Sequence, residues 1–248
     1  TRMTDQQVAV EYWQGSAIKD IAPQLSESIK GGLFFPDTAH TINPSQIVDS
    51  LVSAAKANGV QFKQEKVISG QVHSHGVMLK TESSSSFTAG KVLISCGAHS
   101  AHLTATLTGT KVPLDTERGY HLMLPHERHR LPMAVTSLER RFIMTPMDEG
   151  LRLAGTVEFA GLHRPANMQR AWQLHKLSQG LFKNDLDTTE AKTWMGFRPS
   201  LPDSLPIIDS AKSGKVLLAF GHHHLGLTQA AITAEIVSTL AKQGIQKT

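Results

Sequence analysis

The chain has 248 residues, of which 40% are hydrophobic and 19% charged, a composition typical of a folded globular protein rather than a disordered or fibrous one. The formal net charge of +4 comes from scattered basic residues, which disfavours a nucleic-acid-binding protein, because such proteins gather Lys and Arg on one face. The single cysteine excludes an internal disulfide and favours a reducing compartment.

The first hundred residues predict one helix followed by short strands. The helix is expected over 43–59, where Asn43 can cap the first turn, Pro44 suits its start, and Asn-Gly ends it. Apolar and β-branched runs bounded by glycine and serine predict the strands. These strands are expected over 60–68, 72–75, 77–81 and 91–95.

The middle of the chain alternates short apolar runs with turns that contain proline or glycine. One helix, expected over 165–179, interrupts these runs. The strands are expected over 121–124, 134–138, 142–145 and 151–158. This order favours a mostly antiparallel sheet with one face covered by solvent or by helices.

Two segments share a pattern in which an apolar strand ends at a glycine and leads into a helix. They read VLISCGAHSAHL around Gly97 and VLLAFGHHHLGLT around Gly221. The second is expected to form a strand over 216–220 and a helix over 225–243. Such junctions bring backbone N–H groups to a cofactor in α/β sheets. The whole pattern therefore predicts an α+β (mixed α/β) fold, with helices flanking the antiparallel sheet.

Arg198 is the strongest candidate for binding an anion. It is expected in a turn stiffened by Pro199, Pro202 and Pro206. A buried guanidinium needs an anionic partner. One interpretation is a bidentate clamp on a substrate carboxylate, and the other is a structural salt bridge. On composition alone the salt bridge is favoured, and its candidate partners are Asp203, Asp209 and Glu158.

The other reactive side chains leave simpler alternatives open. Three consecutive histidines, 222–224, diverge at a turn, which disfavours a metal site and favours their backbone N–H groups as donors. Tyr120 either lines a pocket or lies in the core with its hydroxyl paired. Cys96 is expected to be a small buried side chain. The sequence has no local Ser-His-Asp, Walker or HExxH pattern, which leaves hydrolase and NTPase functions without support.

Four motifs resemble those of the D-amino acid oxidase superfamily of FAD-dependent amine oxidoreductases. Within it, the resemblance is strongest to the bacterial D-amino acid dehydrogenases of the small-subunit type, and weaker to glycine and sarcosine oxidases. It extends from about Ile18 to Leu240. The motifs are RGYH at 118–121, TPMDEGLRLAGTVEF at 145–159, WMGFRPSLPDSLPII at 194–208 and GHHHLGLT at 221–228.

The resemblance implies roles for particular residues. Arg198 would bind the substrate carboxylate, and Tyr120 and His224 would contact the substrate. The backbone of Val67 would meet the adenine of FAD, while Cys96 and Gly97 would pass its adenosine half. The residues implied to surround the flavin are Gly221, His222, His223, Gly226, Leu227 and Thr228.

The implied reaction is oxidative deamination of a D-amino acid to a 2-oxo acid, with hydride transfer from Cα to flavin N5 and no catalytic side chain. An oxidase of the glycine or sarcosine oxidase type, or a non-catalytic small-molecule-binding domain, are the alternatives. Segments 1–40 and 110–205 are expected to form a substrate-binding domain. Segments 41–109 and 206–248 are expected to form a partial FAD-binding domain.

The sequence lacks the G-x-G-x-x-G turn with which the FAD fold of this superfamily begins. We therefore expect a truncated chain that by itself binds FAD weakly or not at all. The implied partners are a small D-amino or imino acid and an electron acceptor, either a quinone or a carrier, without nucleic acid, metal or a transmembrane segment. The expected location is the cytoplasm, with a peripheral position on the inner face of a bacterial membrane left open.

Overall fold

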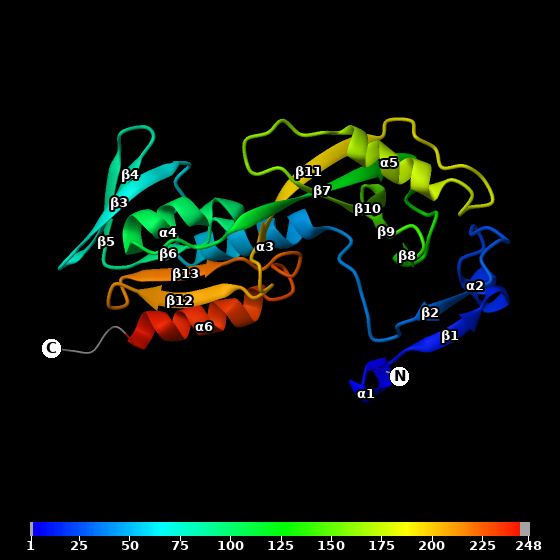
Figure 1. The fold of residues 1–248 in the computed structure, drawn as a ribbon, viewed down its shortest axis with the longest axis horizontal. Helices are drawn as coiled ribbons and strands as arrows, with labels where there is room; N and C mark the ends of the chain where they lie inside the picture. Colours follow the sequence, from blue (N-terminus) through cyan, green and yellow to red (C-terminus); the bar gives the residue numbers. More distant parts are fainter. Residues whose placement is uncertain (1, 244–248) are drawn as a thin grey trace. The chain divides into compact units, whose positions relative to one another are not determined.

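The computed structural model describes residues 2–243 of the chain, which fold as two compact units. Each unit is assembled from three separate stretches of sequence. The first contains Thr1–Val60, Gly119–Val157 and Ala166–Met195, and the second contains Gln61–Arg118, Glu158–Pro165 and Gly196–Thr248. Figure 1 shows the elements in chain order.

A five-stranded sheet in the order β11-β7-β10-β9-β8 holds most of the middle of the chain. The pairs β8–β9 and β9–β10 are antiparallel hairpin neighbours. The strands are β7 (Asp115–Leu124), β8 (Val135–Ser137), β9 (Phe142–Met147), β10 (Gly150–Phe159) and β11 (Lys192–Ser200). The antiparallel sheet expected from the sequence is confirmed.

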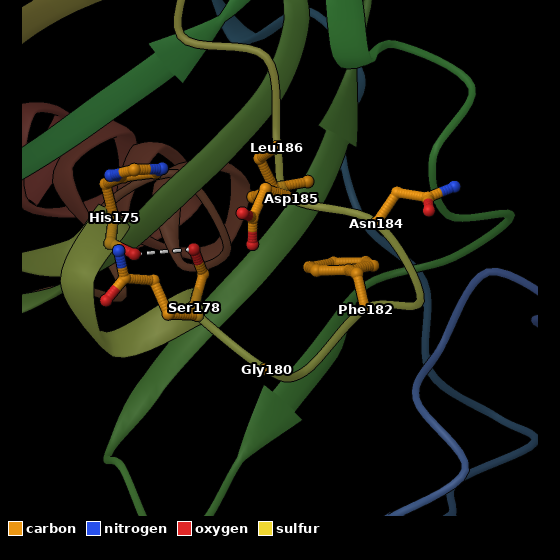
Figure 2. Close-up of a pocket in the computed structure, with 8 residues that line it drawn as sticks. His175, Ser178, Gly180, Phe182, Asn184, Asp185 and Leu186 are labelled. Atoms are coloured by element: carbon orange, nitrogen blue, oxygen red, sulfur yellow. Dashed lines mark hydrogen bonds between the residues drawn. The ribbon is translucent and has the colours of Figure 1, made fainter.

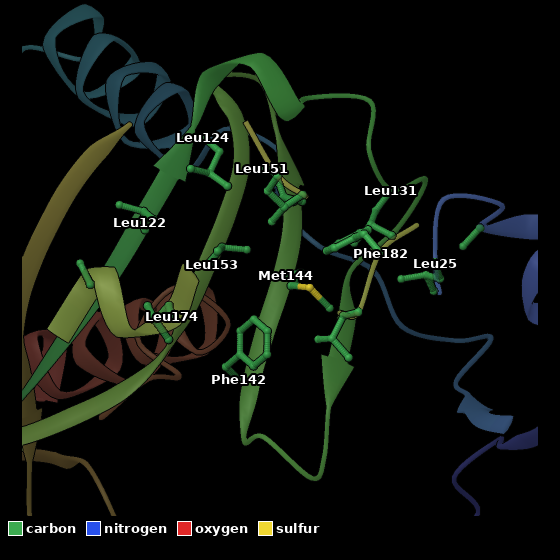
Figure 3. Packing of buried hydrophobic residues seen from close by; sticks show 14 of the residues in the cluster. Leu25, Leu122, Leu124, Leu131, Phe142, Met144, Leu151, Leu153, Leu174 and Phe182 are labelled. Atoms are coloured by element: carbon green, nitrogen blue, oxygen red, sulfur yellow. The ribbon is translucent and has the colours of Figure 1, made fainter. Parts of the chain in front are cut away.

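The core of the first unit lies on one face of this sheet, where alternate residues of β7 point inward. Tyr120, Leu122 and Leu124 are buried there with Phe142 of β9 and with the apolar side of α5 (Gln169–Ser178), as Figure 3 shows. This alternation places the intervening residues of β7 on the other face. The remaining elements of the unit are α1 (Arg2–Asp5), β1 (Glu11–Gln14), α2 (Gly15–Ile21), β2 (Gly31–Phe34), α3 (Pro44–Ala57) and the short 3₁₀ turn η2 (Pro125–Glu127).

The second unit contains two three-stranded sheets. In the first, β13 (Val216–Phe220) pairs antiparallel with β12 (Ile207–Ala211) and parallel with β6 (Val92–Ile94). The other is an antiparallel meander of β3 (Val67–His73), β4 (Gly76–Thr81) and β5 (Ser86–Ala89). The helices are η1 (Gly97–His99), α4 (Ser100–Thr108) and α6 (Ala230–Gln243), and the core side chains are Val77, Ile94, Leu107, Val216, Leu218 and Phe220.

Several expected boundaries are confirmed by local hydrogen bonds. Asn43 caps α3, because its side-chain oxygen accepts a hydrogen bond from the N–H of Gln46 at 3.0 Å. The hairpin at Gly76 forms, with His73 opposite Gly76. The expected strands over 91–95 and 216–220 correspond to β6 and β13.

Other boundaries were predicted wrongly. Residues 61–66 form no strand, because this polar run is exposed and has no neighbouring strand to accept its backbone hydrogen bonds. The helix expected from 225 begins at Ala230, after separate turns closed by the N–H groups of Leu225 and Gln229. Helix α5 begins at Gln169 instead of 165.

Arg198 lies inside the strand β11 and not in a turn. Proline lacks a backbone N–H and is tolerated only where a strand has no neighbour on that side. Because β11 is an edge strand and Pro199 is its penultimate residue, the proline does not prevent the strand from forming.

Candidate functional site

Arg198 is only partly buried, and its guanidinium forms no hydrogen bond or ion pair with any residue that the structure describes. The structural salt bridge to Asp203, Asp209 or Glu158 that composition favoured is therefore absent within residues 2–243. A guanidinium with five unpaired N–H donors in a fixed planar arrangement matches the geometry of a carboxylate. Arg198 is thus available to an anion from outside the described chain.

The two strand–glycine junctions meet at one edge of the sheet in the second unit. Strands β6 and β13 are parallel, and Ile94 pairs with Leu218, so both strands end at the same edge. Gly97 and Gly221 follow at that edge with φ values of +54° and +88°, which glycine adopts without strain. This is the edge at which α/β sheets bind cofactors. The structure therefore brings together the two segments that the sequence singled out.

Cys96 lies at this edge and is exposed, so the prediction of a buried cysteine is wrong. Strand β6 ends at Ile94, and the chain then turns into η1, which carries Cys96 out of the core. The neighbouring Gly97 also faces open space, since a side chain at this position would have no heavy atom within 4 Å.

Residues 221–228 follow β13 and form the Gly221 loop, in which residues 224–228 are exposed. Within residues 2–243, the backbone N–H groups of Gly226, Leu227 and Thr228 donate to no acceptor. Burial lowers the pKa of His222, and the Nε2 atom of its ring lies 3.0 Å from Oγ1 of Thr233. The loop thus offers several backbone donors together with a neutral, fixed imidazole.

The loop is joined to the strand that carries Arg198. The N–H of His223 donates to the carbonyl oxygen of Pro199 at 3.0 Å, so this donor is already used within the protein. The remaining candidate of the loop, His224, is exposed and has no hydrogen-bond partner in the described chain.

Val67 and Tyr120 belong to other elements of the fold than this loop. Val67 begins β3, in the other sheet of the second unit, where His102 of α4 contacts the carbonyl oxygen of Ile68 at 3.1 Å. Tyr120 is only 1% exposed and belongs to the core of the first unit, where its hydroxyl accepts a hydrogen bond from the N–H of Asn167 at 3.2 Å. The core interpretation of Tyr120 is thus correct, because strand alternation turns it inward.

His121, the next residue, points to the opposite face of the sheet and was not identified from the sequence. Its ring stacks on Trp194 of β11, with centroids 4.8 Å apart and an interplanar angle of 14°. Burial, and secondarily the charge of Arg152, lower the pKa of His121 to about 4. The imidazole is therefore neutral at physiological pH. The apolar side chains at every second position, Tyr120, Leu122 and Leu124, are the sequence signal that could have placed His121 on this face.

The depressed pKa of His121 predicts a pH dependence of stability. Between about pH 6.5 and pH 4 the unfolded chain binds a proton at this ring and the folded chain does not, so the free energy of unfolding decreases as the pH falls through this window. His121→Phe keeps an aromatic ring on Trp194 and removes the titration. Urea unfolding at several pH values is expected to give a flatter profile for this variant, and identical profiles would contradict the assignment.

Arg118 is fully buried, and its position was not anticipated. Its Nε donates to the carbonyl oxygen of Gly161 at 2.7 Å, and its Nη1 donates to that of Pro165 at 3.3 Å. Nη1 also lies 3.9 Å from Oε2 of Glu158, and the guanidinium carbon lies 5.4 Å from the ring centroid of Phe197. Arg118 therefore ties the start of β7 to the segment 158–165.

Elsewhere among the described residues, an open hollow of about 670 Å³ is lined by residues 63–66, Glu82 and Ser83. A hollow beside α5, shown in Figure 2, is too small to admit a water molecule, and Oγ of Ser178 donates to the carbonyl oxygen of His175 at its edge. Residues 2–243 contain no group of three His, Cys, Asp or Glu side chains arranged to hold a metal ion. None of the helices described is both long enough and apolar enough to cross a membrane.

Comparison with known proteins shows similarity along almost the whole chain. The model of the family described as "FAD dependent oxidoreductase" (DAO) matches residues 2–240. A D-amino-acid oxidase of Bradyrhizobium diazoefficiens is 30% identical over 222 residues, which are 88% of this chain and 52% of that protein. A D-amino acid dehydrogenase of Paramagnetospirillum magneticum is 27% identical over 228 residues, which are 91% of this chain and 54% of that protein. The chain thus spans about half the length of the curated relatives it matches.

Solved structures share the fold at low sequence identity. Glycine oxidase from Geobacillus kaustophilus superposes with a TM-score of 0.82 at 20% identity, covering 99% of this chain and 66% of that one. L-Proline dehydrogenase from P. horikoshii gives a TM-score of 0.79 at 18% identity, covering 98% of this chain and 67% of that one. The mixed α/β fold predicted from the sequence is thereby confirmed.

Proposed function

The chain belongs to the DAO family of FAD-dependent oxidoreductases, and from that premise we propose that it forms part of an enzyme that oxidatively deaminates D-amino acids. The resemblance inferred from the four sequence motifs is confirmed at the level of the family. The observation that carries the proposal is the partly buried guanidinium of Arg198, which has no partner in the described chain and is joined through Pro199 to the Gly221 loop.

Arg198 would bind the carboxylate of the amino acid through two parallel N–H···O bonds, which fix the orientation of Cα as well as its distance. Strand β11 supports this role because it holds the backbone of Arg198 in an extended conformation. His224, exposed and unpaired in the same part of the second unit, would be a second contact to the substrate. The buried Tyr120 offers no surface for such a contact.

The donors at the sheet edge fit the flavin of FAD. The N–H groups of Gly226, Leu227 and Thr228 are exposed and unused, and so are suited to an electron-rich oxygen or nitrogen. Three features would hold the loop in place. They are Gly221, His222 and the hydrogen bond from the N–H of His223 to Pro199. Gly97 and Cys96 at the same edge, and Val67 on β3, would lie along the adenosine half. When bound, FAD supplies the acceptor for the hydride that leaves the substrate Cα.

The proposal assigns different tasks to different parts of the sequence. Segments 1–40 and 110–205 would form the substrate-binding domain, and segments 41–109 and 206–248 would form part of the FAD-binding domain. The antiparallel β7–β11 sheet supports the first assignment, and the parallel pair β6–β13 with its two glycine junctions supports the second.

The electron acceptor distinguishes two versions of the proposed enzyme. One relative is named an oxidase and another a dehydrogenase, at 30% and 27% identity. A dehydrogenase would pass electrons to a quinone or a carrier, whereas an oxidase would pass them to oxygen. We place the enzyme in the cytoplasm, where a quinone acceptor would require a peripheral position on the inner face of the membrane.

The test uses the full-length protein loaded with FAD. Anaerobic mixing with a panel of D-amino acids, glycine and D-proline is expected to bleach the flavin absorbance with at least one D-amino acid, while the matching L-amino acid leaves it unchanged. Peroxide release in air would then identify an oxidase, and its absence together with reduction of a quinone analogue would identify a dehydrogenase. A flavin that stays oxidised with every amine would favour a non-catalytic binding domain and contradict the proposal.

A further inference from the structure

His223 has a backbone conformation that is uncommon for a residue other than glycine. Its φ is +51°, in the left-handed region that only a few per cent of non-glycine residues adopt. A conformation of this kind persists where surrounding contacts determine it. The contacts of His223 therefore identify what its conformation serves.

Both the backbone and the ring of His223 bind the end of β11. Its N–H donates to the carbonyl oxygen of Pro199 at 3.0 Å, and its ring Nε2 lies 3.0 Å from the backbone nitrogen of Leu201. Pro199 and Leu201 flank Ser200, and Pro199 directly follows Arg198. One residue of the loop thus fixes two successive peptide groups beside the guanidinium-bearing residue.

The hydrogen bond to Leu201 determines how the ring is protonated. A backbone N–H can only donate, so Nε2 must present its lone pair and the proton of a neutral ring must be on Nδ1. Nδ1 lies 3.8 Å from Oε1 of Glu117, too far for a direct hydrogen bond but close enough for attraction to the carboxylate. Both side chains are largely buried, which strengthens this preference. Glu117 therefore favours the tautomer that the Leu201 contact requires.

An independent contact joins the same two segments. Gly221 has no side chain, and a Cβ at this position would lie 2.5 Å from Cδ1 of Leu201. Leu201 therefore packs directly against the backbone at the start of the loop. Packing and hydrogen bonding agree in fixing the end of β11 to this loop.

We propose that His223, oriented by Glu117, is a positioning residue for Arg198. The guanidinium of Arg198 has no polar partner in the described chain, so its position depends on how firmly the backbone beneath it is held. His223 adds to the support given by strand β11, because it holds Pro199 and Leu201 against the Gly221 loop. The inference rests on the proposed function, in which Arg198 binds the substrate carboxylate.

The test compares two substitutions of His223 in the full-length, FAD-loaded enzyme. Asparagine tolerates a positive φ but is too short to reach the N–H of Leu201, whereas the amide oxygen of glutamine can occupy the position of Nε2. His223→Asn is expected to raise KM for the best D-amino acid of the panel about tenfold, the effect of losing one hydrogen bond, with a smaller change in kcat. His223→Gln is expected to restore KM to within about threefold.

A second measurement does not depend on turnover. Hydrogen exchange at the amide of Leu201 is expected to be about tenfold faster in His223→Asn than in the unmodified protein, because the acceptor of this N–H is lost. The exchange rate is expected to recover in His223→Gln. Glu117→Gln removes the carboxylate that favours the tautomer and is expected to produce a smaller change of the same sign in both measurements.

The Arg198→Ala background separates the inference from the proposed function. With Arg198 absent, His223→Asn is expected to cause no further increase in KM. If exchange at Leu201 accelerates while KM stays unchanged, or if the increase in KM persists without Arg198, then His223 is a structural residue and the positioning role is wrong. If Arg198→Ala itself leaves KM unchanged, the carboxylate-binding role fails, and the positioning role that rests on it fails with it.

Discussion

Arg198→Ala is expected to lower kcat/KM for D-amino acids about 10²–10³-fold in the full-length, FAD-loaded enzyme. Charge-assisted hydrogen bonds contribute about 1.5–3 kcal/mol each, and about 1.4 kcal/mol corresponds to a factor of ten in rate or affinity. The loss is expected mainly in KM, with an additional loss in kcat because the carboxylate clamp also orients Cα. Steady-state kinetics with the best D-amino acid measures both.

Two further variants show whether the loss of kcat/KM comes from the bidentate geometry of the Arg198 guanidinium. Arg198→Lys keeps the charge but not the bidentate geometry, and is expected to give an intermediate loss. Arg164→Ala removes an exposed arginine of the second unit and is expected to leave the kinetics unchanged. Because Arg198 has no partner in the described chain, its replacement is not expected to lower the melting temperature. A full retention of kcat/KM in Arg198→Ala would overturn the carboxylate-binding role.

Arg118→Met is expected to reduce the free energy of unfolding by about 3–5 kcal/mol, the range measured when one partner of a buried charged network is removed. The substitution leaves the carbonyl oxygens of Gly161 and Pro165 without their donor and removes a positive charge beside Glu158. It also removes the guanidinium that lies over the ring of Phe197, directly before Arg198. Urea unfolding followed by circular dichroism measures the change.

A matched control for this prediction is Arg164→Met, which makes the same chemical change at an exposed position. Surface substitutions of this kind are expected to change stability by no more than about 0.5 kcal/mol. A similarly small change in Arg118→Met would show that the buried guanidinium contributes little beyond its apolar packing.

The sequence located the two strand–glycine junctions and the arginine because each has a strong local signal. Asn43 followed by Pro44 marked the start of α3, and Gly97 and Gly221 marked the ends of β6 and β13. Turn signals likewise located the antiparallel strands of the middle region. These features depend on residues close together in the chain, so their physical basis can be found in short segments.

Burial was predicted less well, because it depends on which strands become neighbours. From the sequence, Tyr120 could either line a pocket or lie in the core. The pairing of β7 inside a sheet places Tyr120 in the core and turns His121 to the opposite face. Cys96 was expected to be buried and is exposed, because β6 ends two residues earlier. Three prolines, Pro199, Pro202 and Pro206, suggested a turn at Arg198, whereas the edge position of β11 in the sheet allowed a strand instead.

By itself, the sequence determined the family resemblance, the mixed α/β class and the choice of Arg198, since these depend on residue types and local spacing. The tertiary structure alone decided that Arg198 has no partner in the described chain, and that His223 binds the residues beside it. Contacts between residues more than twenty positions apart follow from strand pairing and loop placement. Their partners are fixed by the geometry of the folded chain, which no short stretch of sequence contains.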